Sequence, residues 1–395
     1  QQPFQRFVFV CATAVAMVVA LIPVFRPVPA AAQTAHPEVL AAATAADTIH
    51  ADVPSVTDAP SATGAPSAAD ARLNTIYLPL VQYDRPEIVL GAYLNPEISP
   101  QYYGTVVDQF EALVGREHGI YHYYTHWDLG DFNIGHNIMF QQVVDRGALP
   151  MLSFMSVPGT GSNPAGCGNS TWNLNSILSG RHDAYLHTVA RQVAAFGHDI
   201  LFRWGHEMNL TEYSWAGSCN NRNTQAFIDA YRHIVDIFRA EGATNVQWVW
   251  APNYQSWPLE PWNEYQNYYP GDEYVDWVSV IGYNWGASSP YSGREWDTFT
   301  MLFDEILRDM ARRYPDKPIM ISDYASVEDD GGDKAQWITD AFTDMTNYQN
   351  LRAVVWHHYD PPWYSNARFT VSSSNDALDA YRRAIQGPYF SSQAP

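Results

Sequence analysis

The sequence predicts an α/β fold, a closed (β/α)8 barrel over residues 76–395, and three observations support this prediction. Eight short apolar runs of strand type recur along the chain, and most are continuously apolar, as parallel strands covered on both faces are. Stretches with apolar residues at three- and four-residue spacing separate them, as expected for helices. No G-x-G-x-x-G, G-x-x-x-x-G-K or G-x-S-x-G motif occurs, which argues against a doubly wound nucleotide-binding sheet and against a serine hydrolase.

The strand-like runs begin soon after residue 85 and continue nearly to the end of the chain. They are Ile88–Tyr93, Gly119–Tyr124, Leu149–Met155, Ile200–Trp204, Val246–Ala251, Trp277–Tyr283, Pro318–Ile321 and Leu351–Trp356. Helix-like patterns between them include Tyr185–Phe196, Gln225–Glu241, Trp296–Tyr314 and Lys334–Met345. Residues 253–276 are rich in Pro and aromatic residues and have only a weak helical signal. Eight such units in about 320 residues suit one closed barrel.

The first 75 residues have the pattern of a targeting segment followed by a linker. Residues 7–25 are apolar and carry no charge, Arg6 precedes them, and small residues follow at 30–32. This predicts a signal peptide or a membrane anchor over residues 1–32. Residues 33–75 are rich in Ala, Thr, Pro and Ser, a composition that cannot bury enough apolar surface to fold. We therefore expect a protein that is secreted, or tethered through residues 7–25 to the outer face of the cell membrane.

The composition excludes some partners and favours another. There are 22 Lys and Arg against 42 Asp and Glu, and the net charge of −20 argues against binding nucleic acid or an anionic membrane surface. Charged residues make up only 16% of the chain, whereas aromatic residues make up 14%. Exposed rings stack on flat neutral faces such as those of sugars, so a polysaccharide is the expected partner, although an aromatic-rich core has the same composition. With only 3 Cys, a Cys-rich metal cluster is excluded, and we expect no metal and no cofactor.

Two acidic residues stand at predicted strand ends, where a barrel of this kind carries its chemistry. Glu207 follows the fourth run and Asp323 follows the seventh. These two strand ends lie across the mouth of the barrel from each other, so the two carboxyl groups can converge. Glycoside hydrolysis requires such a pair, because one carboxyl protonates the leaving oxygen while the other attacks the sugar or activates a water. Arg203 and His206 precede Glu207 closely and can tune its protonation.

Four separated motifs resemble those of glycoside hydrolase family 26, and together they cover about residues 85–386. FRWGHEMNLTEYSW, residues 202–215, is similar to the family's acid/base segment. NVQWVWAPN, YYPGDEYVDWVSVIGYNWG and KPIMISDYASVEDDGGDKAQWI then follow in the family's order. The resemblance implies a (β/α)8 β-glycanase that retains the anomeric configuration. The implied substrate is most often β-1,4-mannan, with mixed-linkage β-glucan and β-1,3-xylan as alternatives.

The resemblance also implies roles for individual residues. Glu207 matches the general acid/base, Arg203 and His206 match its supporting residues, Tyr283 matches a tyrosine near the nucleophile, and Trp356 matches an aromatic platform for the sugar. Beside these, Trp215, Trp285 and His126 are candidates for sugar contacts, because they lie in or next to loops that follow strands.

Asp323 departs from the family pattern, which has glutamate at the nucleophile position. Aspartate is one methylene shorter and withdraws its carboxylate by about 1.5 Å. A retaining pair about 5–5.5 Å apart would then be separated by ~6.5–7 Å, at the lower edge of inverting spacing. A strand shift could restore retention, a water could enter and make the enzyme inverting, or activity could be crippled. Leu210 and Glu212, in place of the family's glycine and tryptophan, are further departures that can change a sugar subsite.

Two expectations complete the sequence analysis. Cys167 and Cys219 follow the third and fourth runs in loops at the same end of the barrel, so in an exported protein we expect a disulfide between them. The alternative to an enzyme is an exported polysaccharide-binding or surface-structural protein built on the hydrolase scaffold. The sequence does not determine the oligomeric state. It also does not determine whether the enzyme cleaves bonds within the polysaccharide or at its ends.

Overall fold

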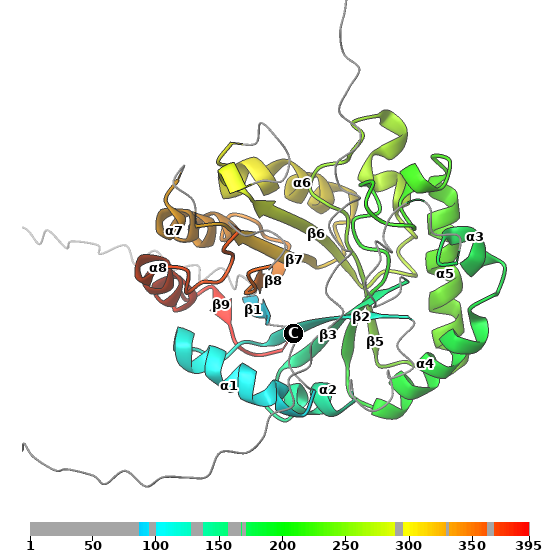
Figure 1. Ribbon diagram of the computed structural model, residues 1–395, viewed down its shortest axis with the longest axis horizontal. Coiled ribbons are helices and arrows are strands. Elements are labelled where there is room, and N and C mark those ends of the chain that lie inside the picture. The colour runs from blue at the N-terminus through cyan, green and yellow to red at the C-terminus, as the bar shows by residue number, and fades with distance from the viewer. Residues whose placement is uncertain are drawn as a thin grey trace, which may run out of the picture. The chain divides into compact units, whose positions relative to one another are not determined.

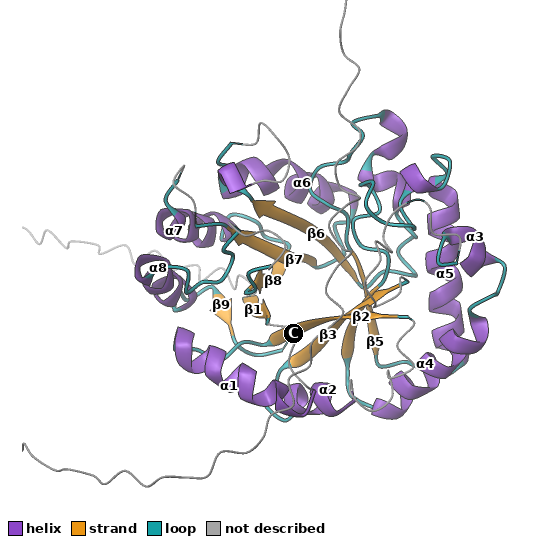
Figure 2. Ribbon diagram, in the orientation of Figure 1, coloured by secondary structure: helices purple, strands orange, loops and turns teal. Residues whose placement is uncertain are grey.

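The computed structural model describes residues 87–94, 100–127, 137–156, 167, 171–288, 295–328, 332–361 and 367–394. The expected closed barrel is confirmed in this part of the chain. Eight strands pair in parallel in the order of the sequence, and β1 pairs with both β2 and β8, which closes the sheet. Helices surround the strands (Figure 1), and loops join the two layers (Figure 2). The expected signal or anchor segment and the linker lie outside the described residues.

The strands and helices agree closely with the predicted runs. The strands are β1 Ile88–Tyr93, β2 Ile120–His126, β3 Leu149–Met155, β4 Ile200–Arg203, β5 Val246–Trp250, β6 Trp277–Asn284, β7 Ile319–Ser326, β8 Leu351–His357 and the short β9 Phe390–Ser391 beside the start of β1. The helices are α1 Tyr103–Val114, α2 Asn137–Val144, α3 Leu174–Leu178, α4 Asp183–Phe196, α5 Thr224–Ala240, α6 Phe299–Arg313, α7 Lys334–Met345 and α8 Asn375–Ile385.

Local sequence signals set the ends of the helices. Side-chain oxygens of Asn223, Thr298, Asp333 and Ser374 accept hydrogen bonds from backbone amides at the starts of α5, α6, α7 and α8. Residues 253–276 form two short 3-10 helices, Pro261–Asn263 and Tyr265–Tyr268, and no α-helix, in line with their weak helical signal. No helix in the described ranges is both long and apolar enough to cross a bilayer.

The inward face of the barrel changes from apolar to polar along the strands. Ten buried apolar residues, contributed by all eight strands, fill its lower part: Val89, Ile120, Leu149, Met151, Leu201, Val249, Trp277, Met320, Ala353 and Val355. Because side chains alternate between the two faces of a strand, residues two positions further along share that inward face. These residues include His122, Ser153, Arg203 and His357, so polar groups gather above the apolar layer.

Strand β7 is longer and less regular than predicted. We expected it to end at Ile321, but it continues to Ser326, so Asp323 lies inside the strand and not beyond its end. Its register shifts against both neighbouring strands around Ser322, because Ile321 and Asp323 pair with consecutive residues of β6. Such a bulge re-aims side chains. It lets Ser322 and Asp323 both turn toward Arg203 inside the barrel, although consecutive residues of a regular strand point to opposite faces.

The expected disulfide is present in the loops at the mouth of the barrel. Cys167, which follows β3, is bonded to Cys219, which follows β4, across 52 residues of sequence. The bond therefore ties two loops on the face that carries Glu207.

We expect Cys219→Ser to lower the free energy of unfolding by about 2–4 kcal/mol, because a cross-link over a loop of this length restricts the unfolded chain. Urea denaturation monitored by tryptophan fluorescence measures this loss. Cys167→Ser should give the same loss, and the double variant should lose no more than either single one. An unchanged midpoint in Cys219→Ser would contradict a stabilising cross-link.

Candidate active site

A buried guanidinium organises the lower wall of the site. Arg203, the last residue of β4, is fully buried, and its Nη2 donates to Asp323 Oδ2 at 2.7 Å and to the Tyr124 hydroxyl at 2.9 Å. Its Nη1 donates to Ser322 Oγ at 2.8 Å and its Nε donates to Ser153 Oγ at 2.7 Å. Tyr124 in turn donates to Asp323 Oδ2 at 2.9 Å. Residues from β2, β3, β4 and β7 thus meet at one cation.

Asp323 receives further hydrogen-bond donors on its other oxygen. His122 Nδ1 lies 3.4 Å from Oδ1, and His357 Nδ1 lies 3.5 Å from the same atom. The Nε2 atom of His122 lies 3.3 Å from Arg203 Nη2, which can only donate, so Nε2 is the acceptor and Nδ1 carries the hydrogen. His122 is therefore neutral, and its Nδ1–H lies 3.4 Å from Asp323 Oδ1. The pKa of His122 agrees, because burial lowers it to about 4.

The Asp323 carboxylate is held ionised. Burial alone would raise its pKa, but the charge of Arg203 and the hydrogen bonds from His122 and His357 outweigh burial, and the pKa lies well below its ordinary value. The same burial would lower the pKa of Arg203, but Tyr124 and Asp323 raise it above its ordinary value. Asp323 is thus a permanent negative charge across the physiological pH range.

Glu207 lies in a strained turn after β4. Its φ is +53°, in the left-handed region, which costs a residue with a side chain about 1–2 kcal/mol. The Glu207 amide donates to the Ala251 carbonyl at 2.8 Å, and this bond helps to hold the turn against β5. Backbone strain of this kind is commonly found at functional sites, where it aims a side chain.

Two side chains donate to the Glu207 carboxyl. Asn253 Nδ2 donates to Oε1 at 2.8 Å, and the Tyr213 hydroxyl lies 3.4 Å from Oε2. Asn209 fixes Asn253 in turn, because its Oδ1 accepts from the Asn253 amide at 2.9 Å and its Nδ2 donates to the Asn253 carbonyl at 3.0 Å. The carboxyl is therefore oriented from the chain segments after β4 and β5.

Glu207 holds its proton much more tightly than Asp323. Burial raises its pKa to about 7, although the hydrogen bond from Asn253 opposes the shift; nearby Glu212 adds to it. One carboxyl of the site is thus protonated near neutrality while the other is ionised. Two acids whose environments separate their pKa values in this way are suited to act as a proton donor and as an anion.

An aromatic wall stands beside Asp323. The Tyr283 hydroxyl lies 3.4 Å from His357 Nδ1, and the His357 ring is stacked on Tyr93 with centroids 4.6 Å apart. Phe369 packs against Tyr283 at 5.4 Å and against Trp285 at 4.9 Å. Two predicted sugar-binding residues, Tyr283 of β6 and Trp285 directly after β6, are partly exposed and belong to this wall.

Three of the predicted site residues lie elsewhere, or make other contacts, than the sequence led us to expect. Arg203 binds Asp323 and not Glu207, because it lies on the inward face of β4, below the turn that carries Glu207. Trp356 is fully buried on the outer face of β8, where its Nε1 donates to the Phe369 carbonyl at 2.9 Å, so it is no sugar platform. Trp215 is also fully buried, and its ring is stacked on Tyr213.

The other two predicted residues are His206, next to Glu207, and His126, at the end of β2. His206 is buried, its ring contacts those of Tyr213 and Tyr124, and burial holds its pKa well below the ordinary value. It is therefore a neutral packing group beside Glu207. His126 ends β2 on the same face as His122 and Tyr124 and is partly exposed.

Several residues of the site were not identified from the sequence. They are His122, Tyr124, Ser153, Tyr213, Asn253, Ser322 and His357. The signal that could have found the strand residues His122, Tyr124, Ser153 and His357 is their spacing of two or four residues from the apolar inward residues of their own strands.

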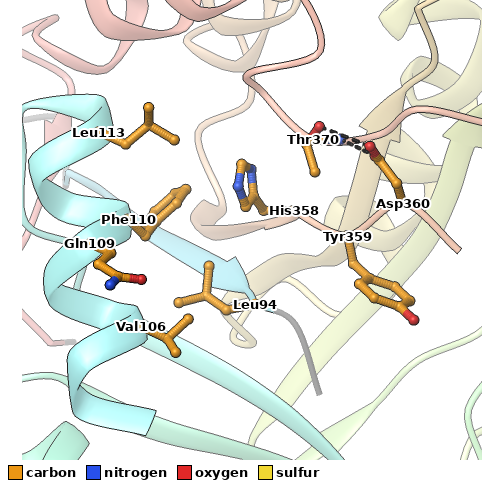
Figure 3. Close-up of a pocket in the computed structure, with 9 residues that line it drawn as sticks. All are labelled: Leu94, Val106, Gln109, Phe110, Leu113, His358, Tyr359, Asp360 and Thr370. Carbon is orange, nitrogen blue, oxygen red and sulfur yellow. Dashed lines mark hydrogen bonds between the residues drawn. The ribbon is translucent and has the colours of Figure 1, made fainter. Parts of the chain in front are cut away.

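A cavity of about 470 Å³ lies elsewhere, between α1 and the loop after β8 (Figure 3). Phe110 and Leu113 of α1 line it on one side, and His358, Asp360 and Thr370 line it on the other. None of the residues predicted for the site lines it.

Comparisons with known proteins give one family. The sequence profile of glycosyl hydrolase family 26 matches residues 175–307, which include Glu207 and Tyr283 but end before Asp323. Endoglucanase H of Acetivibrio thermocellus is 35% identical over 301 residues, which are 75% of this chain and 30% of that protein. Beta-1,3-xylanase TXYA of a Vibrio species is 27% identical over 108 residues, 27% of this chain and 22% of that protein. The matches thus span less than a third of the length of these relatives.

Solved structures share the fold at low identity. An endo-beta-1,4-mannanase of Cellulomonas fimi superposes with a TM-score of 0.59 at 18% identity and covers 77% of this chain and 72% of its own. The catalytic domain of a family 26 endo-beta-1,4-mannanase from Bacillus sp. JAMB-750 gives the same TM-score and identity, covering 77% of this chain and 87% of its own. At 18% identity these superpositions show a shared fold and nothing further.

We expect Asn253→Ala to raise the pKa of Glu207 above about 7 and Glu212→Gln to lower it, because the first change removes a donor to the carboxylate and the second removes a nearby negative charge. NMR titration of glutamate labelled with ¹³C at the carboxyl carbon, compared with Glu207→Gln for assignment, measures both shifts. Shifts in the same direction in the two variants would contradict the electrostatic description of Glu207.

Proposed function

Because the chain belongs to glycoside hydrolase family 26, we propose that it is a β-glycanase that hydrolyses internal β-glycosidic bonds of a polysaccharide. The observation that carries the proposal is the opposite protonation of two carboxyl groups at the mouth of one barrel, Glu207 with a pKa raised to about 7 and Asp323 with a pKa well below its ordinary value. Such a pair supplies the acid and the anion that glycoside hydrolysis requires.

In the proposed mechanism Glu207 protonates the leaving oxygen and Asp323 Oδ1 attacks the anomeric carbon. The bond from carbon to the leaving oxygen breaks as the bond to Asp323 forms, giving a glycosyl ester. Glu207, now ionised, takes a proton from a water that cleaves this ester, and the configuration is retained. Arg203 and Tyr124 hold Oδ2 and thereby leave Oδ1 as the attacking atom. The Asp323 side chain has no exposed surface, so the sugar reaches Oδ1 only with a small displacement of the ring edges that cover this atom, those of His122 and His357.

Three polysaccharide backbones are candidate substrates. The sequence motifs favour β-1,4-mannan. The relative at 35% identity is named an endoglucanase, which favours a β-glucan as the second candidate, and the more distant xylanase makes β-1,3-xylan a third. The alternative of a sugar-binding protein without activity predicts saturable binding and no release of reducing ends.

We also propose that the protein works outside the cytoplasm. The disulfide between Cys167 and Cys219 suits an oxidising compartment. Residues 7–25, which lie outside the described residues, would supply the export signal or the tether to the outer face of the membrane. Fractionation of cells that express the full chain, with and without residues 1–32, tests this proposal; equal retention of both forms in the cytoplasm would contradict it.

We expect the protein to release reducing ends from soluble mannan, mixed-linkage β-glucan or β-1,3-xylan, and we expect Glu207→Ala to lower the rate at least about 10²-fold, since general acid catalysis is lost. A reducing-sugar assay on the three polymers measures this. Glu260→Ala, a change at a partly exposed carboxyl in the loop after β5, is the matched control and should leave the rate unchanged. Binding to a polymer without any release of reducing ends would leave only the binding-protein alternative.

The pH dependence should follow the two pKa values. Catalysis needs Glu207 protonated and Asp323 ionised, so kcat/KM should fall as the pH rises through about 7 and should stay high on the acid side until Asp323 takes up a proton, well below its ordinary pKa. Initial rates from pH 3 to 9 on one soluble substrate give the profile. A rate that keeps rising from pH 6 to 9 would contradict Glu207 as the acid.

A further inference from the structure

Four side chains cover the two carboxylate oxygens of Asp323. Arg203 and Tyr124 cover Oδ2, whereas His122 and His357 cover Oδ1. Of the two histidines on Oδ1, His122 is fully buried and His357 keeps 15% of its side chain exposed. A sugar that approaches Oδ1 therefore meets His357 first.

The hydrogen bonds of His357 fix which of its nitrogens faces the sugar. Nδ1 lies 3.5 Å from Asp323 Oδ1, and an ionised carboxylate can only accept, so Nδ1 carries the hydrogen. The Tyr283 hydroxyl, 3.4 Å from Nδ1, can accept from the same N–H group. In the neutral ring Nε2 is then an acceptor, and no described residue donates to it. Among the described residues, His357 thus offers a free acceptor at the edge of the site.

The ring of His357 is held in one orientation. It is stacked on Tyr93, and it meets Tyr283 edge to face at 5.4 Å and Phe369 at 6.1 Å. The backbone that carries Phe369 is itself fixed, because the buried Lys334 ammonium donates to the carbonyls on both sides of it, those of Arg368 and Thr370, at 2.9 and 2.8 Å. Nε2 therefore presents its lone pair in a defined direction.

From this geometry we propose that His357 is a specificity-determining residue, whose Nε2 accepts a hydrogen bond from the C2 hydroxyl of the sugar under attack. The inference rests on the function proposed above. Asp323 Oδ1 is directed at C1 of that sugar, His357 adjoins Oδ1, and the hydroxyl group next to C1 is the one on C2. The C2 hydroxyl is equatorial in glucose and axial in mannose, so a fixed acceptor distinguishes the two sugars.

His358, the residue directly after β8, provides a matched control. His358 points to the opposite side of the strand, where it lines the cavity against α1 with its ring 4.9 Å from Phe110 (Figure 3). Its Nδ1 accepts from the Val371 amide at 3.1 Å. A substitution at His358 therefore perturbs the chain next to His357 without removing a contact to Asp323.

The experiment compares three matched aryl β-oligosaccharides in which the sugar at the cleaved bond is glucose, mannose or their common 2-deoxy analogue. His357→Asn keeps a donor near Asp323 but removes the acceptor at Nε2. We expect it to move the ratio of kcat/KM for the glucose and mannose substrates toward one by about 5- to 10-fold, the effect of one hydrogen bond. The ratio of kcat/KM on the 2-deoxy substrate to kcat/KM on the preferred epimer should be higher in His357→Asn than in the wild type.

His357→Gln, whose longer amide can place an oxygen near the position of Nε2, should restore part of the ratio, and His358→Asn should leave it unchanged. A ratio that stays the same in folded His357→Asn would overturn the proposal while leaving the hydrolase intact. A wild-type protein with no preference between the epimers would overturn it as well. Absence of hydrolysis of every substrate and polymer would instead remove the proposed function.

Discussion

The buried ion pair between Arg203 and Asp323 is the interaction on which the rest of the site depends. Both side chains are fully buried, and burying two charges is favourable only when their remaining hydrogen-bonding groups are satisfied. Here strands β2, β3 and β7 supply those groups, through Tyr124, Ser153 and Ser322. Removing one partner would leave an unpaired charge inside the barrel at a cost of about 3–5 kcal/mol. The pair therefore fixes the bulge in β7 as well as the position of the carboxylate.

The two carboxyl groups show how neighbouring environments can produce opposite protonation. Asp323 is fully buried and Glu207 is partly buried, and burial by itself favours the neutral acid. Asp323 has a guanidinium and further donors around it and stays ionised, whereas Glu207 has two neutral donors, Asn253 and Tyr213, and keeps its proton near neutrality. The shorter aspartate side chain agrees with this division, because it draws the carboxylate down to the level of Arg203 and His122.

Much of the fold, and the two acids, could be predicted from the sequence. Each predicted strand and each of the four predicted helices is a continuous stretch of sequence with its own pattern. Glu207 and Asp323 stand out as carboxyl groups next to apolar runs. The inward or outward direction of residues could not be predicted, because strands covered on both faces are apolar throughout. Trp356 was therefore expected to face the sugar, although it is buried on the outer face of β8 and His357 faces inward. The bulge at Ser322, which depends on pairing with β6 and β8, left no local signal. Asn253 comes from a segment without regular structure.

Covalent trapping tests most directly whether Asp323 is the anion that reaches the sugar. A 2-deoxy-2-fluoro β-glycoside with a good leaving group should form a stable ester, and peptide mass spectrometry should place the added sugar on Asp323. The label should be absent from Asp323→Asn. Turnover of natural substrate without any trapped ester, or an ester on another residue, would contradict the account.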